Sequence, residues 1–184
     1  MPWQLLEYSS WVVVTLAGFR IAQKLFVTGG RAFPFGAKRL DTLMTTGVRR
    51  GLNRVDFRLL LIESPRFPLA IQSGHGNFAS LPAEVIEHVP PLLEEAIAFA
   101  QQIPDEKRRI GVISHRERGR RGKITVSATG NPDRPVNVKV KPWVEGAVIG
   151  GYRLTLTQAS ALAEAMNSYL TSVAHARRYA IDRQ

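Results

Sequence analysis

The chain has 184 residues, a formal net charge of +10 and no cysteine. This length suits one domain or two small ones and is enough to bury a substantial core. The lack of cysteine excludes a disulfide framework, a thiolate nucleophile and a zinc site with cysteine ligands. The most apolar stretch, residues 11–16, is too short to span a bilayer, so we expect no membrane partner. The composition fits the cytoplasm, and an organellar matrix or nucleoid is also compatible with it.

The first half is predicted to consist mainly of strands. Residues 11–30 are rich in β-branched and aromatic side chains and predict one or two strands that end at a Gly-Gly turn. Residues 38–48 fit either a short helix or a basic loop. Residues 54–63 and 67–72 predict two further strands, and a turn is predicted at residues 74–77.

A helix is predicted to begin at residues 81–84, because a proline stands in its first turn and glutamates stand near its positive end. The Pro90-Pro91 pair is predicted to kink this helix or to divide it in two. Its inward face is marked by apolar residues at helical spacing, namely Val85, Val89, Leu92, Leu93, Ala96, Ile97 and Ala100.

The second half repeats this order of elements. Residues 109–116 predict a strand, with a turn at residues 119–122. Residues 124–128 and 136–144 alternate apolar with polar side chains, as strands with one solvated face do. A turn at residues 131–133 separates these two strands.

Residues 152–156 predict a fourth strand, and Thr157 is predicted to cap a long helix after it. The inward face of that helix would carry Leu162, Met166, Tyr169, Leu170 and Val173. We therefore predict an α+β fold of two similar strands-then-helix (ββββα) units, residues 1–103 and 104–184, which form antiparallel sheets packed on helices. An internal duplication that forms one pseudo-symmetric domain and a chance recurrence of strand–helix order both explain this pattern.

The basic residues are unevenly distributed. Eight of the 25 fall between Lys107 and Lys123, where Glu117 is the single acid, whereas residues 82–106 carry six acids and no lysine or arginine. A cluster of like charges repels itself, so it usually lies where a polyanion can neutralise it. A solvated loop is the alternative explanation for this cluster.

The candidate phosphate-binding residues come from this cluster and from the strand at residues 136–144. They are Lys107, Arg108, Arg109, Arg116, Arg118, Arg120, Arg121, Lys123, Lys139 and Lys141. Lys139 and Lys141 are two residues apart, so they share one face of the strand while Val138 and Val140 pack inward. Trp143 follows on the polar face and is the candidate on which a base would stack, with a core or interface position as the alternative.

The first half carries a second, looser basic set, namely Arg49, Arg50, Arg54, Arg58 and Arg66. If the two halves are related, this set would extend the same groove, and ordinary surface charge is the alternative. The glutamates of the first helix, Glu84, Glu87, Glu94 and Glu95, would face away from a nucleic acid.

Two segments of the second half, RERGRRGKITV and GGYRLTLTQASALAEAM, resemble a known family. They are similar to the carboxy-terminal domain of the eukaryotic transcription positive cofactor four and its bacterial relatives, where a strand with Arg/Lys-Gly-Lys leads into the sheet and Gly-x-x-Leu-Thr begins the helix. The Whirly and Pur proteins use the same strands-then-helix unit twice and bind single-stranded nucleic acid on the sheet. The resemblance covers about residues 107–176, and the lysine-rich motif of Whirly proteins is absent. It implies binding of single-stranded DNA or RNA with little sequence preference, and helices that form the core or the interface of a homo-oligomer.

The sequence shows no motif for catalysis. The histidines, His75, His88, His115 and His175, are scattered along the chain. Asp56 and Glu63 are seven residues apart on one predicted strand, which separates them by more than about 20 Å and leaves them unsuited to share a Mg²⁺ ion. We therefore expect no catalytic residue, no metal and no cofactor.

Three functions follow from these observations as hypotheses. The first is non-enzymatic binding of single-stranded DNA or RNA through a basic sheet face. The second is an accessory or inhibitor protein, of the kind found in plasmids or phages, that binds an acidic protein surface. The third is a nucleic-acid-processing enzyme without a recognisable motif.

Overall fold

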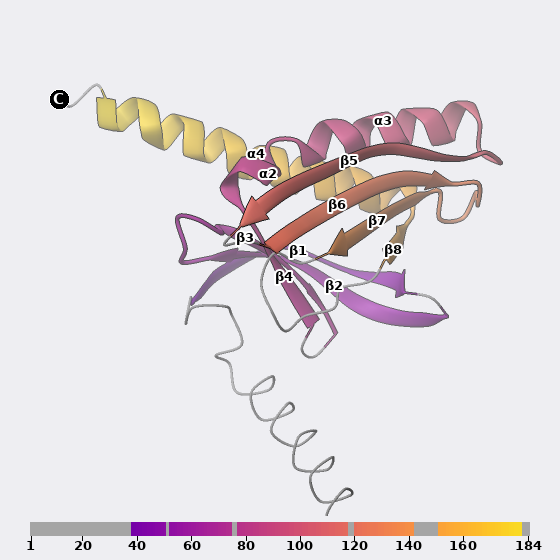
Figure 1. Ribbon diagram of the computed structural model, residues 1–184, viewed down its shortest axis with the longest axis horizontal. Coiled ribbons are helices and arrows are strands. Elements are labelled where there is room, and N and C mark those ends of the chain that lie inside the picture. The colour runs from indigo at the N-terminus through magenta and orange to yellow at the C-terminus, as the bar shows by residue number, and fades with distance from the viewer. Residues whose placement is uncertain (1–37, 51, 75–76, 118–119, 142–150, 182–184) are drawn as a thin grey trace, which may run out of the picture.

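The computed structural model describes residues 38–50, 52–74, 77–117, 120–141 and 151–181. The strands predicted at residues 11–30 lie outside them. The described residues form a mixed α+β fold in which one eight-stranded antiparallel sheet is combined with helices (Figure 1). No helix in this part of the chain is both long and apolar enough to cross a membrane.

In chain order, the described residues form four strands, two helices, four further strands and a last helix. These elements are β1 (Arg39–Arg50), β2 (Asn53–Ile62), β3 (Leu69–Ser73), β4 (Asn77–Leu81), α2 (Ala83–Ile86), α3 (Val89–Gln102), β5 (Lys107–Glu117), β6 (Arg120–Thr129), β7 (Val136–Lys141), β8 (Gly151–Leu154) and α4 (Leu156–Ile181).

The strands lie in the order β4-β3-β2-β1-β8-β7-β6-β5, so each half contributes four adjacent strands. The halves meet where β1 pairs with β8, at Arg49 opposite Arg153. They therefore form one continuous antiparallel sheet. Helices α3 and α4 pack on each other, α3 lies on β5–β7, and α4 lies on β1 and β8.

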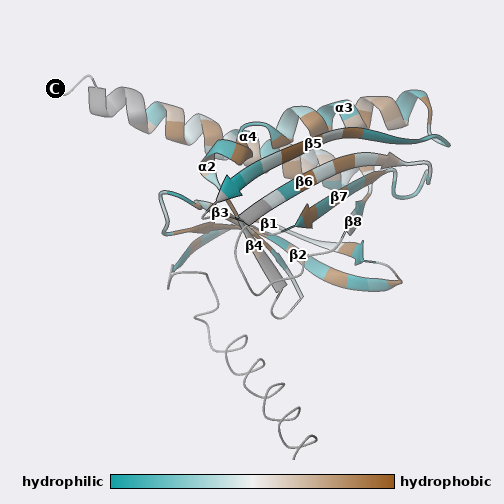
Figure 2. Ribbon diagram, viewed as in Figure 1, coloured by the Kyte–Doolittle hydropathy of each residue, from teal (hydrophilic) through white to brown (hydrophobic). Residues whose placement is uncertain are grey.

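The strands predicted in the second half are confirmed at residues 109–116, 124–128, 136–141 and 152–154, and residues 142–144 lie outside the described residues. Val136, Val138 and Val140 of β7 are buried, whereas Lys139 and Lys141 are exposed. On β6 the buried residues are likewise every second residue, and Figure 2 shows polar and apolar residues mixed along these strands. The turn predicted at 119–122 is wrong for residues 120–122, because they belong to β6 and pair with residues 115–117 of β5.

Residues 38–48, predicted as a short helix or a basic loop, instead form most of β1. This strand pairs with β2 from Arg39 opposite Ile62 to Arg50 opposite Asn53. Two register shifts, between Arg39 and Asp41 and between Thr42 and Met44, interrupt the alternation of its side chains. The irregular pattern hid the strand from sequence reasoning, although its threonines and valine favour β-structure.

Asn77 was predicted to lie in a turn, but it begins β4, which pairs with β3 through Leu81. The predicted division of the following helix is confirmed. The chain leaves helical hydrogen bonding at residues 87–88, and Pro90 and Pro91 occupy the first turn of α3, where the absence of an N–H donor costs nothing.

The last helix begins at Leu156, so Thr157 is not its cap. Thr155 takes this role: the Gln158 N–H donates to Thr155 Oγ1 at 3.2 Å, and the Thr155 N–H donates to Gln158 Oε1 at 3.1 Å. This reciprocal pair is a capping box, with glutamine in the third position after the cap. Beyond the sheet, α4 continues towards the C-terminus as a projecting rod (Figure 1).

The core lies between the sheet and helices α3 and α4. Leu93 and Ala96 of α3 and Leu162 and Met166 of α4 are buried in one cluster with the inward residues of the strands. The ring of Phe57 on β2 meets the ring of Tyr152 on β8 edge to face, with centroids 5.1 Å apart and an interplanar angle of 73°. This aromatic pair joins the two halves of the sheet through the core.

Candidate nucleic-acid interface

The register of the strands divides their side chains between two faces. Three contacts identify the face that the helices cover: Arg108 lies over Phe99 of α3, Gly111 lies against Leu92 of α3, and Thr46 accepts a hydrogen bond from Gln158 of α4. Directly paired residues of antiparallel strands point to the same side, so the pairing extends this assignment from strand to strand.

We call the opposite surface of β5–β8, β1 and β2 the open face. On β2 the open face ends at Arg58, because Leu60 and Ile62, further along the same side of the strand, are buried. The described residues of the open face are Lys107, Arg109, Val112, Ser114 and Arg116 of β5, Lys123, Thr125, Ser127 and Thr129 of β6, Asn137, Lys139 and Lys141 of β7, Gly151 and Arg153 of β8, Thr45, Gly47 and Arg49 of β1, and Arg54, Asp56 and Arg58 of β2. None of them is buried, so this surface is accessible to a ligand.

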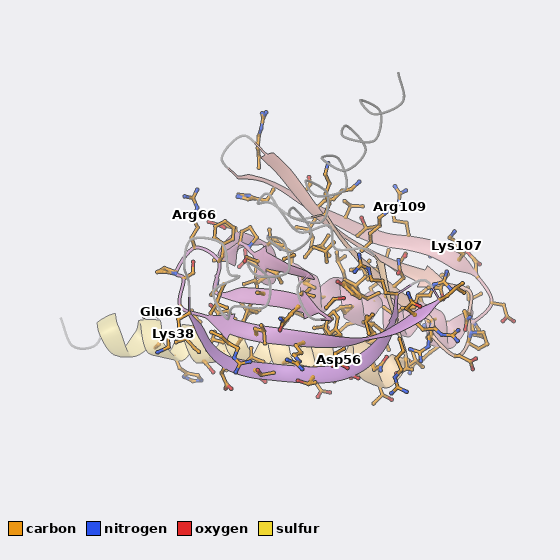
Figure 3. All side chains as sticks on the ribbon, turned by 90° about the horizontal axis from the view of Figure 1, so that it is seen from below. Lys38, Asp56, Glu63, Arg66, Lys107 and Arg109 are labelled. Carbon is orange, nitrogen blue, oxygen red and sulfur yellow. The ribbon has the colours of Figure 1, made fainter. Side chains whose placement is uncertain are left out.

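The open face is strongly basic. The register places a single acidic side chain on it among the described strand residues, Asp56, whose Oδ2 lies 3.8 Å from Nη2 of Arg58. Every strand from β5 through β8 to β2 contributes at least one exposed lysine or arginine to this surface. Figure 3 shows Lys107 and Arg109 projecting from β5.

Several of these cations stand directly opposite one another on neighbouring strands. Lys123 pairs with Lys141 between β6 and β7, and Arg49 is flanked by Arg54 on β2 and Arg153 on β8. Like charges in directly opposed positions destabilise a sheet. An anion bound over these positions would remove that repulsion.

The structure brings together six of the residues predicted from the sequence, namely Lys107, Arg109, Arg116, Lys123, Lys139 and Lys141. Arg108 is not among them, because its guanidinium carbon lies 5.0 Å from the Phe99 ring centroid on the helix-covered face. Its placement follows from the alternation of β5, which sends Arg108 and Arg109 to opposite sides.

The other predicted residues cannot be assigned to a face. Arg118 and Trp143 lie outside the described residues, and for Arg120 and Arg121 the structure describes the backbone in β6 but not the side chains.

The five arginines of the second basic set do not all lie on one face. Arg49, Arg54 and Arg58 lie on the open face, whereas Arg50 has the opposite parity and Arg66 lies in the connection between β2 and β3. The predicted extension of the basic surface into the first half therefore involves three of the five arginines.

Arg153 is an open-face residue that the sequence reasoning missed. It stands between Tyr152 and Leu154, which are both fully buried. The alternation of this short strand was a usable signal, because an arginine flanked by two inward apolar residues points outward.

Small polar residues occupy the centre of the open face. Asn137 Nδ2 donates to Ser127 Oγ at 3.5 Å, and both side chains are only partly exposed. A Cβ atom at Gly151 would lie 2.9 Å from Asn137 Oδ1, so glycine leaves room for this amide. The cations therefore surround short polar side chains that can form hydrogen bonds.

Acidic residues gather on the other side of the molecule. Glu94 and Glu95 are exposed on α3, which packs on the helix-covered face, and Glu94 Oε1 accepts a hydrogen bond from Asn167 of α4 at 3.2 Å. Glu84 and Glu87, on and just after α2, are exposed as well. Charge of opposite sign is therefore separated across the sheet.

Tyr152, a buried residue of the core, has a shifted pKa. Burial raises the pKa of Tyr152 above its ordinary value of 10.0, and this effect is opposed by nearby Ser73 and by the charge of Arg50. Tyr152 Oη and Ser73 Oγ are buried without a hydrogen bond of good geometry, although the two groups are close enough to interact.

Within the described residues no three histidine, aspartate or glutamate side chains are grouped so that they could hold a metal ion. Asp56 and Glu63 lie well apart along the β2 region (Figure 3). Comparison of the chain with family models and with curated proteins finds no match.

Proposed function

We propose that this protein binds single-stranded DNA or RNA on the open face, with little sequence preference and without catalysis. The observation that carries the proposal is the one-sided charge: cations from neighbouring strands share a surface with a single described carboxylate, and the acidic helices pack behind it. Such an arrangement attracts a polyanion and orients the protein upon it.

Phosphate contacts would supply most of the affinity. Each phosphate that a lysine or arginine neutralises releases a counterion, and this release drives binding at low salt. Such contacts position the backbone and carry little information about base sequence. Low sequence specificity is the consequence.

A preference for single strands is the finer part of the proposal. The hydroxyl and amide groups of Ser127 and Asn137 are placed to bond exposed base edges between the cations. Stacking would come from Trp143, which follows β7 by two residues in the sequence and lies outside the described residues. The sequence resemblance described above favours the same binding mode.

We also propose that residues 1–103 and 104–184 are two related ββββα units. The order β4-β3-β2-β1 in one half and β8-β7-β6-β5 in the other supports this, because the units follow each other in the same sense across the sheet. In each half the four strands are followed by helix, which has two segments in the first half and one in the second.

Arg108 and Arg109 form a matched pair for testing the interface. They are adjacent in sequence, and each loses the same charge when it is changed to glutamine, but they lie on opposite faces of β5. We expect Arg109→Gln to weaken oligonucleotide binding and Arg108→Gln to leave it nearly unchanged, as measured by fluorescence anisotropy. Equal losses in the two variants would contradict an interface on the open face.

The salt dependence of binding provides a second measurement. For a single strand, the logarithm of the affinity should fall with the logarithm of the salt concentration, with a slope of about −0.7 per neutralised phosphate. Arg109→Gln should reduce the magnitude of that slope by about 0.7 if it removes one phosphate contact. Parallel titrations with single- and double-stranded DNA and RNA would test the preference for single strands, and tighter binding to duplex would contradict it.

One observation favours a second candidate, an acidic protein surface as the partner. The described part of the open face carries charge but no aromatic side chain on which a base could stack. A protein partner would need only complementary charge. Capture of a protein that survives nuclease treatment, together with no affinity for oligonucleotides, would support this candidate over the first.

A further inference from the structure

Three arginines meet where the two halves of the sheet join. Arg153 of β8 stands opposite Arg49 of β1, and Arg49 stands opposite Arg54 of β2. We call these three residues the arginine triad. We propose that the triad is a binding site for one phosphate group, an inference that rests on the proposed function only for the identity of the molecule that carries this phosphate.

The spacing of the triad suits a single small anion. The Cβ atoms of directly opposed residues are about 5 Å apart, so the outer two arginines are about 10 Å apart at their Cβ atoms. Arginine side chains are long enough to close that span, and their planar guanidinium groups can each give two parallel hydrogen bonds to a phosphate. All three side chains are exposed on the open face.

The absence of a side chain at Gly47 leaves room for the guanidinium of Arg54. A Cβ atom at Gly47 would lie 2.8 Å from Nε and 3.1 Å from Nη2 of Arg54. The guanidinium of Arg54 therefore lies across β1, in space that any larger residue at position 47 would occupy. This placement brings its charge from β2 towards the strand that carries Arg49.

The carboxylates of the described residues do little to neutralise the triad. Among the described residues, no ion pair within 4.0 Å joins any of the three arginines to an acid. The nearest acid in the register is Asp56, opposite Gly47, and its closest cation is Arg58 at 3.8 Å. Three adjacent like charges repel one another, and a bound phosphate would convert that repulsion into attraction.

Because of the position of the triad, an anion bound there should stabilise the sheet. Among the described residues, Arg49 opposite Arg153 is the single paired position between β1 and β8, so an anion held by both arginines bridges the two halves. A ligand that binds only the folded state raises the melting temperature. Phosphate should therefore stabilise the protein more than chloride does at equal ionic strength.

The first experiment measures the melting temperature in inorganic phosphate and in chloride, at pH 7 and matched ionic strength. We expect the phosphate-dependent increase in the wild type to be lost in Arg49→Gln, Arg54→Gln and Arg153→Gln. Lys107→Gln, which removes the same charge from the far end of the open face, should keep the increase. If Lys107→Gln loses the phosphate-dependent increase equally, the attraction is diffuse and the proposed site is wrong. The proposed site is also wrong if the wild type shows no increase.

Two further variants test the geometry. Gly47→Ala leaves the net charge unchanged but displaces the Arg54 guanidinium, so it should reduce the phosphate-dependent increase. Asp56→Asn removes the neighbouring carboxylate and should enlarge it, a gain that misfolding cannot imitate. If the phosphate-dependent increase in either variant equals that of the wild type, the proposed arrangement is overturned.

Oligonucleotides then identify the source of the phosphate. If a 5′-phosphorylated strand binds more tightly than its 5′-hydroxyl counterpart and Arg153→Gln removes the difference, the site holds a terminal phosphate. If the two strands bind alike and both lose affinity in Arg153→Gln, it holds a backbone phosphate. If neither strand depends on Arg153, the triad is not a phosphate site of the nucleic-acid interface. If phosphate raises the melting temperature through the triad but no oligonucleotide binds, the phosphate site is supported and the proposed function is rejected.

Discussion

Gln158 connects three parts of the molecule through one side-chain amide. Its Oε1 accepts from the N–H of Thr155, while its Nε2 donates to Thr46 Oγ1 at 3.0 Å and to the carbonyl oxygen of Gly47 at 2.7 Å. The residue that completes the cap of α4 therefore also holds β1 next to the junction with β8. The capping pattern can be found in the sequence, but the bonds to β1 depend on the tertiary structure.

Gln158→Glu separates these two roles. A carboxylate still accepts the N–H of Thr155, but it cannot donate to Gly47 and it repels that carbonyl oxygen. We expect the free energy of unfolding to fall by about 1–3 kcal/mol, the usual cost of leaving a polar group in the interior unsatisfied. Guanidinium denaturation measures this, with Gln158→Ala as a comparison that should cost at least as much. Wild-type stability in Gln158→Glu would show that the bonds to β1 contribute nothing.

Tyr152 makes the stability of the protein sensitive to alkaline pH. Since burial raises the pKa of its phenol in the folded state, the neutral phenol contributes stability that is fully present below the unfolded pKa near 10.0 and is lost as the pH rises through the folded value. Tyr152→Phe removes this contribution and also an unsatisfied buried hydroxyl.

We therefore expect Tyr152→Phe to be as stable as the wild type or more stable at pH 7, and to lose less stability between pH 9 and pH 11. Chemical denaturation at a series of pH values is the measurement. A large loss of stability at pH 7 would show instead that the hydroxyl makes a strong interaction with Ser73.

At the level of elements, the turn between β6 and β7 depends on a glycine. Gly130 has a φ angle of 68°, in the left-handed region, and a Cβ atom there would lie 2.7 Å from the carbonyl oxygen of Asp105. Asn131 completes the turn, because its Oδ1 accepts from the N–H groups of Asp133 and Arg134. The turn was predicted correctly, but its contact with the segment before β5 was not.

Gly130→Ala combines backbone strain with this steric contact, whereas Gly74→Ala provides the strain alone. Gly74 has a φ angle of 60° and no atom within 4 Å of the Cβ position. We expect about 1 kcal/mol of destabilisation for Gly74→Ala and clearly more, about 2–3 kcal/mol, for Gly130→Ala, measured by thermal unfolding. Equal effects would mean that the segment around Asp105 moves away without cost.

At the level of the whole molecule, the positive charges of the open face should lower the stability of the protein and strengthen its binding to a nucleic acid. Lys123 and Lys141 stand opposite each other on the open face. Lys141→Gln should raise the melting temperature at low salt, because it removes a repulsion, and should weaken oligonucleotide binding. Salt screens exposed charges, so the difference in melting temperature should shrink at high salt. A lower melting temperature at low salt would contradict the repulsion.

The elements with regular side-chain patterns could be predicted from the sequence. The alternation of valine with lysine identified β7 and its exposed face, and the paired prolines identified the division between α2 and α3. These signals are local, because side chains two apart on a strand or three to four apart on a helix share a face. Where two register shifts break the alternation, as in β1, the same reasoning proved wrong.

Which charges share a surface depends on the tertiary structure and could not be predicted from the sequence. The cluster between Lys107 and Lys123 appeared as one unit in the sequence, yet β5 sends Arg108 to the helices and Arg109 to the open face. Conversely, Arg49, Arg54 and Arg153 are scattered in the sequence and meet only because β1 pairs with both β2 and β8. The alternation within a strand shows which side chains share a face, but it does not show which distant strand will lie beside it.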